Sequence, residues 1–199
     1  MLSRYQILNF AELGDTETYL SPDIPMLSLD SPAGLFMTDF LTIHPVVVCE
    51  TTNVDDALGI MKQSCVRLLL VHGHTDQTFR GMITASDING GKVLSFMSTH
   101  QIQHRNEVEV RHIMKTRADI HAFLYEDVRE ACIGDVILTI KNLGEQHVLV
   151  MEESDGKQIV RGMYSTTDIA KALRIEFDVE PHARTFFELE QAILHHDIA

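Results

Sequence analysis

Two aspartates, Asp87 and Asp168, close a seven-residue phrase that occurs twice in the chain. The copies, Gly81–Asp87 and Gly162–Asp168, both read glycine, two apolar residues, a hydroxyl residue, two spacers and aspartate. A carboxylate can accept two hydrogen bonds from a vicinal diol, which is what an acidic residue does for ribose in dinucleotide-binding folds. The phrase therefore has the residue types needed to hold a nucleoside.

The hydroxyl residues of the phrase are Thr84 and Ser165, which we expect at the end of a strand, where a hydroxyl can bond a phosphate or cap a turn. Ser86 and Thr167, just before the aspartates, suit the N-cap of a following helix. Each aspartate would then lie in the first helical turn, where free backbone N–H groups favour anions. A plain helix cap in both copies stays open as the alternative, because duplication copies caps as well.

The repeat continues on the N-terminal side of the phrase. Residues 67–71 resemble residues 146–150, and the matched positions keep their order along the chain. Order kept over such a distance indicates a duplicated structural unit. Further matched pairs are Met37 with Met114, Ile43 with Ile120, and His44 with His121.

Each copy predicts the same order of elements: strand, helix, strand, strand and the start of a second helix. Short apolar runs bounded by turn residues predict the strands, and apolar residues three and four positions apart predict the helices. The expected fold class is therefore mixed α+β, with two β-α-β-β-α units. In the first copy we expect strands at Val46–Cys49, Val66–His72 and Phe79–Ala85, with a helix from Val54 to Cys65; in the second, strands at Ile120–Tyr125, His147–Met151 and Ile159–Tyr164, with a helix over Val128–Leu143.

The net charge of −13 over 199 residues is concentrated at the two ends of the chain. Residues 1–35 contain one arginine and five acids, and residues 176–199 contain one arginine and six acids. The middle, residues 36–175, holds 14 basic and 18 acidic residues. No basic stripe is available for a nucleic-acid backbone, so we expect no nucleic-acid partner. The nearly balanced middle can still hold one phosphate locally.

Composition also places the protein in a broad class. No run of 18 or more apolar residues is present, so no membrane span is expected. The N-terminus lacks the apolar stretch and cleavage site of a secretion signal. Cys49, Cys65 and Cys132 form no CxxC pair and are expected to be reduced thiols. We therefore expect a cytoplasmic protein.

Other residue types that carry chemistry give weaker patterns. Eleven histidines are present, but no HExxH phrase or Cys/His ligand set accompanies them, so no metal is expected. No nucleophile–base pair can be nominated, which argues against an enzyme. Arg80 and Arg161 precede the glycines of the phrase and could reach a phosphate, although single strand arginines more often face solvent.

The segments outside the repeat look different from it. Residues 1–35 hold three of the five prolines and predict an irregular arm. At the other end, Phe186, Leu189 and Ile193 give an apolar stripe on an amphipathic helix, which would pack on the body of the protein or on a partner chain. The expected organisation is an arm at 1–35, a first unit at 36–97, a linker at 98–109, a second unit at 110–177 and a tail at 178–199.

The tandem phrase, closing a β-α-β-β-α unit, resembles the pattern of the CBS (cystathionine β-synthase) domain pair, or Bateman module. Residues 110–114, Val-Arg-His-Ile-Met, are similar to the usual entry into such a domain, and residues 35–37 are a looser version. The resemblance covers residues 36–175. It implies two units packed about a pseudo-twofold axis, two clefts between them, and dimerisation of such modules into a disc.

The resemblance also implies a ligand and its contacts. Many members bind AMP, ADP, ATP or S-adenosylmethionine in these clefts. The ribose-binding aspartate falls on Asp87 and Asp168, and the neighbouring hydroxyl falls on Thr84 and Ser165. Adenine contacts come from the first strand of each unit, which places Ile43, His44, Ile120 and His121 among the binding residues.

The two copies are not equal. Asp87 is followed by Ile-Asn-Gly-Gly, a poor helix start because each glycine costs about 1 kcal/mol relative to alanine. The second copy continues with Ala170-Lys-Ala172, a good helix, so we expect the site at Asp168 to be the occupied one if only one ligand binds.

The sequence thus predicts a non-catalytic regulatory protein. It would sense an adenosine nucleotide and pass that state to an unidentified partner protein or to its own homodimer. The alternative is a structural dimerisation module whose clefts are degenerate and empty. A third hypothesis, an enzyme of unrecognised chemistry, has no set of residues to support it.

Overall fold

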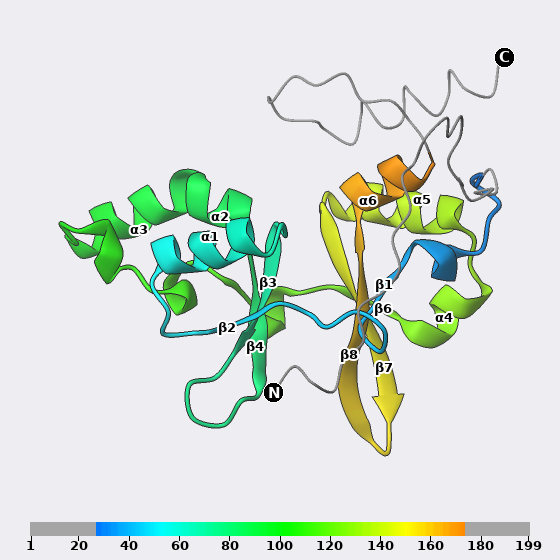
Figure 1. The fold of residues 1–199 in the computed structure, drawn as a ribbon, viewed down its shortest axis with the longest axis horizontal. Coiled ribbons are helices and arrows are strands. Elements are labelled where there is room, and N and C mark those ends of the chain that lie inside the picture. Colours follow the sequence, from blue (N-terminus) through cyan, green and yellow to red (C-terminus); the bar gives the residue numbers. More distant parts are fainter. Residues whose placement is uncertain (1–26, 174–199) are drawn as a thin grey trace, which may run out of the picture.

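The structure is a computed structural model and describes residues 27–173 (Figure 1). Two four-stranded sheets face each other across the middle of the molecule, and the helices cover their outer faces. The mixed α+β fold predicted from the sequence is confirmed. Most of the N-terminal arm and the predicted amphipathic helix of the tail lie outside the described residues. No helix in the described part is long and apolar enough to cross a membrane.

The first sheet has the strand order β2-β3-β4-β5, with β2 and β3 parallel and the other pairs antiparallel. Its inner strand β3 is apolar from Leu68 to Val71, where both faces are buried. Leu69 and Val71 face the helices, whereas Leu68 and Leu70 face the other sheet. The elements of this half are β2 (Val47–Cys49), α1 (Val54–Gln63), β3 (Leu68–His72), β4 (Phe79–Thr84), α2 (Ala85–Asn89), α3 (Gly91–His100), the 3-10 helices at Arg105–Glu107 and Val110–His112, and β5 (Lys115–Thr116).

The second sheet repeats this arrangement in the order β6-β7-β8-β1, with β6 and β7 parallel. The strands β7 and β8 form a long antiparallel hairpin that extends beyond the rest of the sheet (Figure 1). The elements of this half are the 3-10 helix at Ala33–Phe36, β1 (Thr38–Asp39), the 3-10 helix at Arg117–Asp119, β6 (Ala122–Leu124), α4 (Tyr125–Glu130), α5 (Ile133–Leu143), β7 (His147–Ser154), β8 (Lys157–Ser165) and α6 (Thr166–Ala172).

The segment that leads into each unit joins the sheet of the other unit. β1, at the start of the first predicted unit, pairs with β8, whereas β5, at the start of the second predicted unit, pairs with β4. The cores follow the same exchange. Ala33 and Phe36 are buried in the core of the second half, and Val108 and Val110 in the core of the first. The two sheets therefore draw on residues from both sides of the boundaries that the sequence repeat predicts.

A small apolar cluster joins the two halves. Leu68, Leu70, Met82 and Leu149 are buried where the sheets face each other. Burial of an aliphatic side chain stabilises a fold by about 1.5–3 kcal/mol. The cluster thus holds the sheets together and fixes the space that remains between them.

Two predicted helices are interrupted in the structure. The helix predicted over Val128–Leu143 is two helices, α4 and α5, with a break at Ala131–Cys132. The backbone of residues 29–33 bonds to this break, and the N–H groups of Ile133 and Gly134 donate to Ser31 and Leu29. The strand predicted over Ile120–Tyr125 is limited to β6, because Tyr125 already begins α4. In the first half, the chain after β4 forms α2 and α3, separated at Gly90, and α3 continues three residues into the predicted linker.

Candidate functional site

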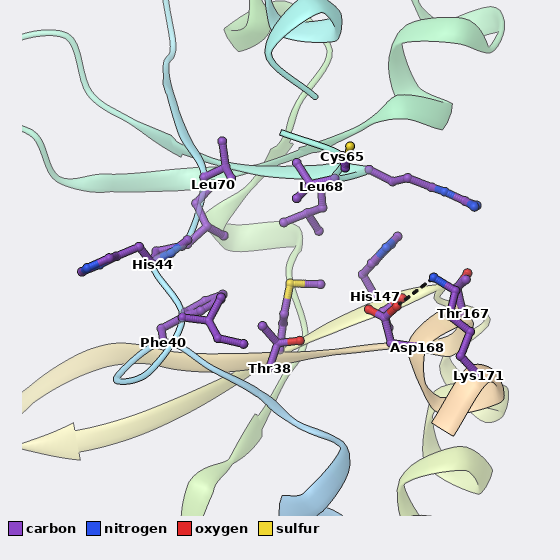
Figure 2. A pocket seen from close by; sticks show the side chains of 17 residues that line it. Thr38, Phe40, His44, Cys65, Leu68, Leu70, His147, Thr167, Asp168 and Lys171 are labelled. Carbon is purple, nitrogen blue, oxygen red and sulfur yellow. Dashed lines mark ion pairs between the residues drawn. The ribbon is translucent and has the colours of Figure 1, made fainter. Parts of the chain in front are cut away.

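A cleft of about 200 Å³ opens between the two halves (Figure 2). One wall is the segment that runs from β1 to β2, and another is β3 with the residues just before it. The opposite side is built from the start of β7, the end of β8 and the first turns of α6. The cleft is therefore lined by both halves of the molecule, and anything bound in it would contact both.

The structure brings four of the predicted site residues together and leaves four outside this cleft. Asp168, Ser165, Ile43 and His44 line it. The four predicted residues that do not line it are Asp87, Thr84, Ile120 and His121, of which Ile120 packs against the apolar cluster between the sheets. Ile43 and His44 of the first unit line the same cleft as Asp168 of the second, because the chain between β1 and β2 crosses from the second sheet to the first.

The helix caps differ from the prediction. α2 begins after Thr84 and α6 begins after Ser165, so the strand-end hydroxyl residue occupies the N-cap position in each copy. Ser86 and Thr167, the predicted N-caps, lie inside the first turn. Both hydroxyls of each phrase suit a cap chemically. The extended backbone of Thr84 (ψ 161°) and Ser165 (ψ 127°) decides between them, because the N-cap is the last non-helical residue.

Asp168 presents an open carboxylate to the cleft. Its side chain is 55% exposed, and it forms a long ion pair with Lys171, at 3.6 Å, which is the dashed line in Figure 2. Ser165 makes no side-chain cap bond to the helix. The carboxylate of Asp168 is thus free to accept hydrogen bonds from a ligand.

Asp87 is in the opposite state. Its side chain is 15% exposed and belongs to a capping box with Thr84, whose backbone N–H and hydroxyl donate to the carboxylate at 2.9 and 2.6 Å. Lys92 Nζ donates to the other oxygen at 2.6 Å. Burial raises the pKa of this carboxyl, but Lys92 and Thr84 outweigh it and hold the pKa below its ordinary value. The first copy of the phrase therefore acts as a helix cap.

The rest of the lining combines apolar and cationic groups. Phe40, Leu70 and Met163 offer apolar surface, and Arg67 and Lys171 carry positive charge. Asp168 is the only acidic residue among the lining residues. Such a mixture suits a ligand with a flat apolar part and an anionic part. Among the described residues, no group of three or more His, Cys, Asp or Glu side chains is arranged to hold a metal ion.

His147 is a cleft residue that the sequence analysis did not assign to the site. It lines the cleft beside Asp168 at the start of β7 (Figure 2). Burial lowers its pKa and nearby Arg67 adds to the effect, whereas Asp168, Asp87 and Glu145 oppose it. The repeat aligns His147 with Leu68, which lines the cleft from the first half. That symmetry was the signal that could have placed it here.

The expectation that Arg161 faces solvent was wrong. Its side chain is only 9% exposed, and the guanidinium is paired with Asp39 and with Glu152, at 3.0 Å for the latter. It also lies over the ring of Tyr125, 4.8 Å from the ring centre. Arg80, its counterpart in the first copy, is exposed as expected and pairs with Asp76 at 2.7 Å.

Comparisons with known proteins agree with this architecture. Residues 37–90 match the family model described as CBS domain. The two halves have the same strand arrangement, and solved CBS structures have the same overall fold. The chain has the fold of a CBS-domain pair. No curated protein sequence matches the chain.

Three solved structures illustrate the similarity. An uncharacterized conserved protein from Pyrococcus horikoshii has 19% identity and a TM-score of 0.53, covering 77% of this chain and 100% of that one. The CBS domain of the bacterial CNNM/CorC family Mg²⁺ transporter has 12% identity and a TM-score of 0.51, covering 76% and 80%. CBSX2 in complex with AMP has 20% identity and a TM-score of 0.48, covering 71% and 95%.

Proposed function

We propose that this CBS pair is a non-catalytic regulatory module that binds an adenosine nucleotide in the cleft between its halves. The open carboxylate of Asp168 carries the proposal, because it lines the cleft together with Ile43 and His44 and makes no capping hydrogen bond in its own helix. In the proposed complex it accepts hydrogen bonds from both ribose hydroxyls. Hydrogen bonds to a charged group are worth about 1.5–3 kcal/mol each, a large part of the ~8 kcal/mol behind micromolar binding.

The charges around the cleft favour a phosphorylated ligand. Arg67 and Lys171 would attract the phosphates of AMP, ADP or ATP. S-adenosylmethionine carries a cationic sulfonium instead, which these two side chains would repel. The apolar groups near Ile43 and Leu70 give a surface for the adenine ring. We therefore rank the nucleotides above S-adenosylmethionine.

Signalling follows from the position of the cleft. A ligand that contacts both halves binds most tightly when they stand at one particular separation, and this differential affinity shifts the population toward that arrangement. The changed arrangement would be passed to a partner protein or to a second copy of the chain in a homodimer.

A structural dimerisation module with empty clefts is the second candidate, and one observation favours it for half of the molecule. Asp87 is already bonded to Thr84 and Lys92, so the first copy offers no open acid for a ribose. The proposal accordingly assigns one nucleotide to each chain, at Asp168.

Isothermal titration of the full chain with AMP, ADP, ATP and S-adenosylmethionine tests the proposal. We expect heat from at least one nucleotide, a stoichiometry of one per chain, and weaker or no binding of S-adenosylmethionine. Absence of heat and of any thermal shift with all four ligands would favour the dimerisation module. A stoichiometry of two would contradict the assignment of Asp87 as a cap.

A further inference from the structure

Residues 38–46, here called the cleft strap, link β1 in the second sheet to β2 in the first. Six lining residues of the cleft belong to the strap: Thr38, Phe40, Ile43, His44, Pro45 and Val46. Only Thr38 and Asp39 of the strap are in a strand, so a two-residue pairing with β8 is its sheet contact at this end. The shape of this wall therefore depends on what holds the strap near β1.

Asp39 organises the turn of the strap. Its backbone carbonyl accepts hydrogen bonds from the N–H groups of Thr42 and Ile43, at 3.1 and 2.9 Å. Its carboxylate accepts the N–H of Leu41 at 2.7 Å and the guanidinium of Arg161. These bonds fold residues 39–43 into a compact turn, and the direction of Ile43 and His44 follows from it.

Arg161 holds this turn to the second sheet. Its guanidinium pairs with Asp39, and the backbone carbonyl of Arg161 accepts a hydrogen bond from the N–H of Phe40 at 3.0 Å. Glu152 and the ring of Tyr125 fix the arginine side chain in turn. Arg161 does not line the cleft. Arg161 is buried whereas Asp39 is partly exposed, so loss of Asp39 leaves a buried guanidinium short of one partner charge, which is unfavourable.

We propose that Arg161 is a positioning residue for the ligand site, acting through Asp39 to set the strap wall against which the adenine lies. The inference rests on the proposed nucleotide function for its effect on affinity. The anchoring of the strap itself is a separate physical claim that can be measured without any ligand.

The chain offers a reporter and a matched control. It contains no tryptophan, and Leu41, at the tip of the turn, is 78% exposed, so Leu41→Trp places a single fluorophore in the strap. In that background we would compare Arg161→Met, Arg161→Lys, Asp39→Asn and the double variant Asp39→Asn/Arg161→Met. The control is Arg80→Met, the same substitution at the repeat-related arginine, whose ion pair is exposed and does not line the cleft.

Two measurements give the readout: fluorescence anisotropy of the tryptophan without ligand, and the Kd for AMP. We expect Arg161→Met and Asp39→Asn each to lower the anisotropy and to raise the Kd about tenfold. The double variant should be no worse than either single one, because both remove the same contact. Arg161→Lys, which keeps the charge, should restore the Kd to within about threefold, and Arg80→Met should change neither quantity.

Several results would overturn the proposal. Unchanged anisotropy in both Arg161→Met and Asp39→Asn would show that this pair does not anchor the strap. Lowered anisotropy with an unchanged Kd would show that the strap does not position the ligand. Additive losses in the double variant would show that Arg161 does not act through Asp39. Should Arg161→Met fail to fold, Asp39→Asn and Arg161→Lys decide. If the parent protein binds none of AMP, ADP and ATP, the nucleotide proposal fails and the positioning role fails with it, while the anisotropy still decides the anchoring.

Discussion

The two aspartates of the repeated phrase should separate stability from binding when each is replaced by alanine. In Asp87→Ala the backbone N–H and hydroxyl of Thr84 and the ammonium of Lys92 lose a partner that is mostly buried. Leaving such donors unsatisfied costs about 1–3 kcal/mol, and the gain in helix propensity returns only a few tenths. We expect a net loss of about 2 kcal/mol in the free energy of unfolding, or about 4–8 °C in Tm for a domain of this size.

Asp168→Ala should behave in the opposite way. Its carboxylate makes no cap bond and has one exposed ion pair at 3.6 Å, so its removal should change stability by less than about 0.5 kcal/mol. The nucleotide loses both proposed ribose bonds, and the Kd should rise at least tenfold, since about 1.4 kcal/mol corresponds to a factor of ten.

Urea unfolding followed by circular dichroism, together with titration of AMP, measures both quantities on the same four proteins: the parent, the two single variants and the double variant. The reasoning is refuted if Asp168→Ala destabilises the fold as much as Asp87→Ala, or if Asp87→Ala weakens AMP binding as much as Asp168→Ala. Asp87 and Asp168 have no hydrogen bond or ion pair in common, so the double variant should show the sum of the stability losses.

Three further predictions follow from single contacts. Burial lowers the pKa of His147 from its ordinary value of 6.5, so below that pH the unfolded chain binds more protons than the folded one, and the free energy of unfolding should fall as the pH drops from 7 toward 5. His147→Leu should reduce this pH dependence in urea titrations, and an unchanged dependence would contradict the prediction. A Cβ on Gly81 would lie 2.1 Å from the carbonyl oxygen of Lys115, so Gly81→Ala should lower the free energy of unfolding in urea by about 1–3 kcal/mol. Gly34→Ala, which has open space around it, should lower it by less than about 0.5 kcal/mol, and equal losses would argue against the β4–β5 contact. Hydrogen bonds from Thr51, and to a smaller extent from His74, lower the pKa of Cys49 to about 7. The rate of its alkylation by iodoacetamide, measured by peptide mass spectrometry, should therefore have a midpoint near pH 7, and this midpoint should rise in His74→Ala. A midpoint near pH 9 in the parent protein would refute the assignment.

The order of elements was predictable because it is written in local patterns. The apolar spacing predicts a helix from Val54 to Cys65, and α1 lies there. Asn53 caps α1 and Gly144 ends α5, and both are residue types that favour these positions. Gly144 adopts φ +66°, the left-handed conformation that ends a helix. These features depend on neighbours within a few residues, so a single sequence contains the information.

Features that depend on distant partners were not predictable. Arg161 is buried because Asp39, 122 residues away, pairs with it. The break between α4 and α5 contains neither glycine nor proline, and it exists because residues 29–33 bond to the backbone there. The strands β1 and β5 have two residues each, too short for any periodicity to reveal.

The candidate site has features of both kinds, some readable from local sequence and some that depend on distant contacts. The two acids and the two hydroxyls of the phrase were found from the repeat, and the inequality between the copies was expected from the glycines after Asp87. The reason observed is different: Asp87 is occupied by Thr84 and Lys92. No local pattern distinguishes a carboxylate that caps its own helix from one that faces a cleft.

The exchanged lead-in segments make the two halves interlocked. A fragment ending near residue 104 would keep β4 but lose β5, and would lack Val108 and Val110 from its core. The complementary fragment would lack β1 together with Ala33 and Phe36. Neither half can then satisfy its own sheet edge, so each would seek the missing strand in another molecule. Co-expressed fragments should therefore reassemble, and a gene that loses one repeat would encode a chain prone to swapping rather than a smaller working protein.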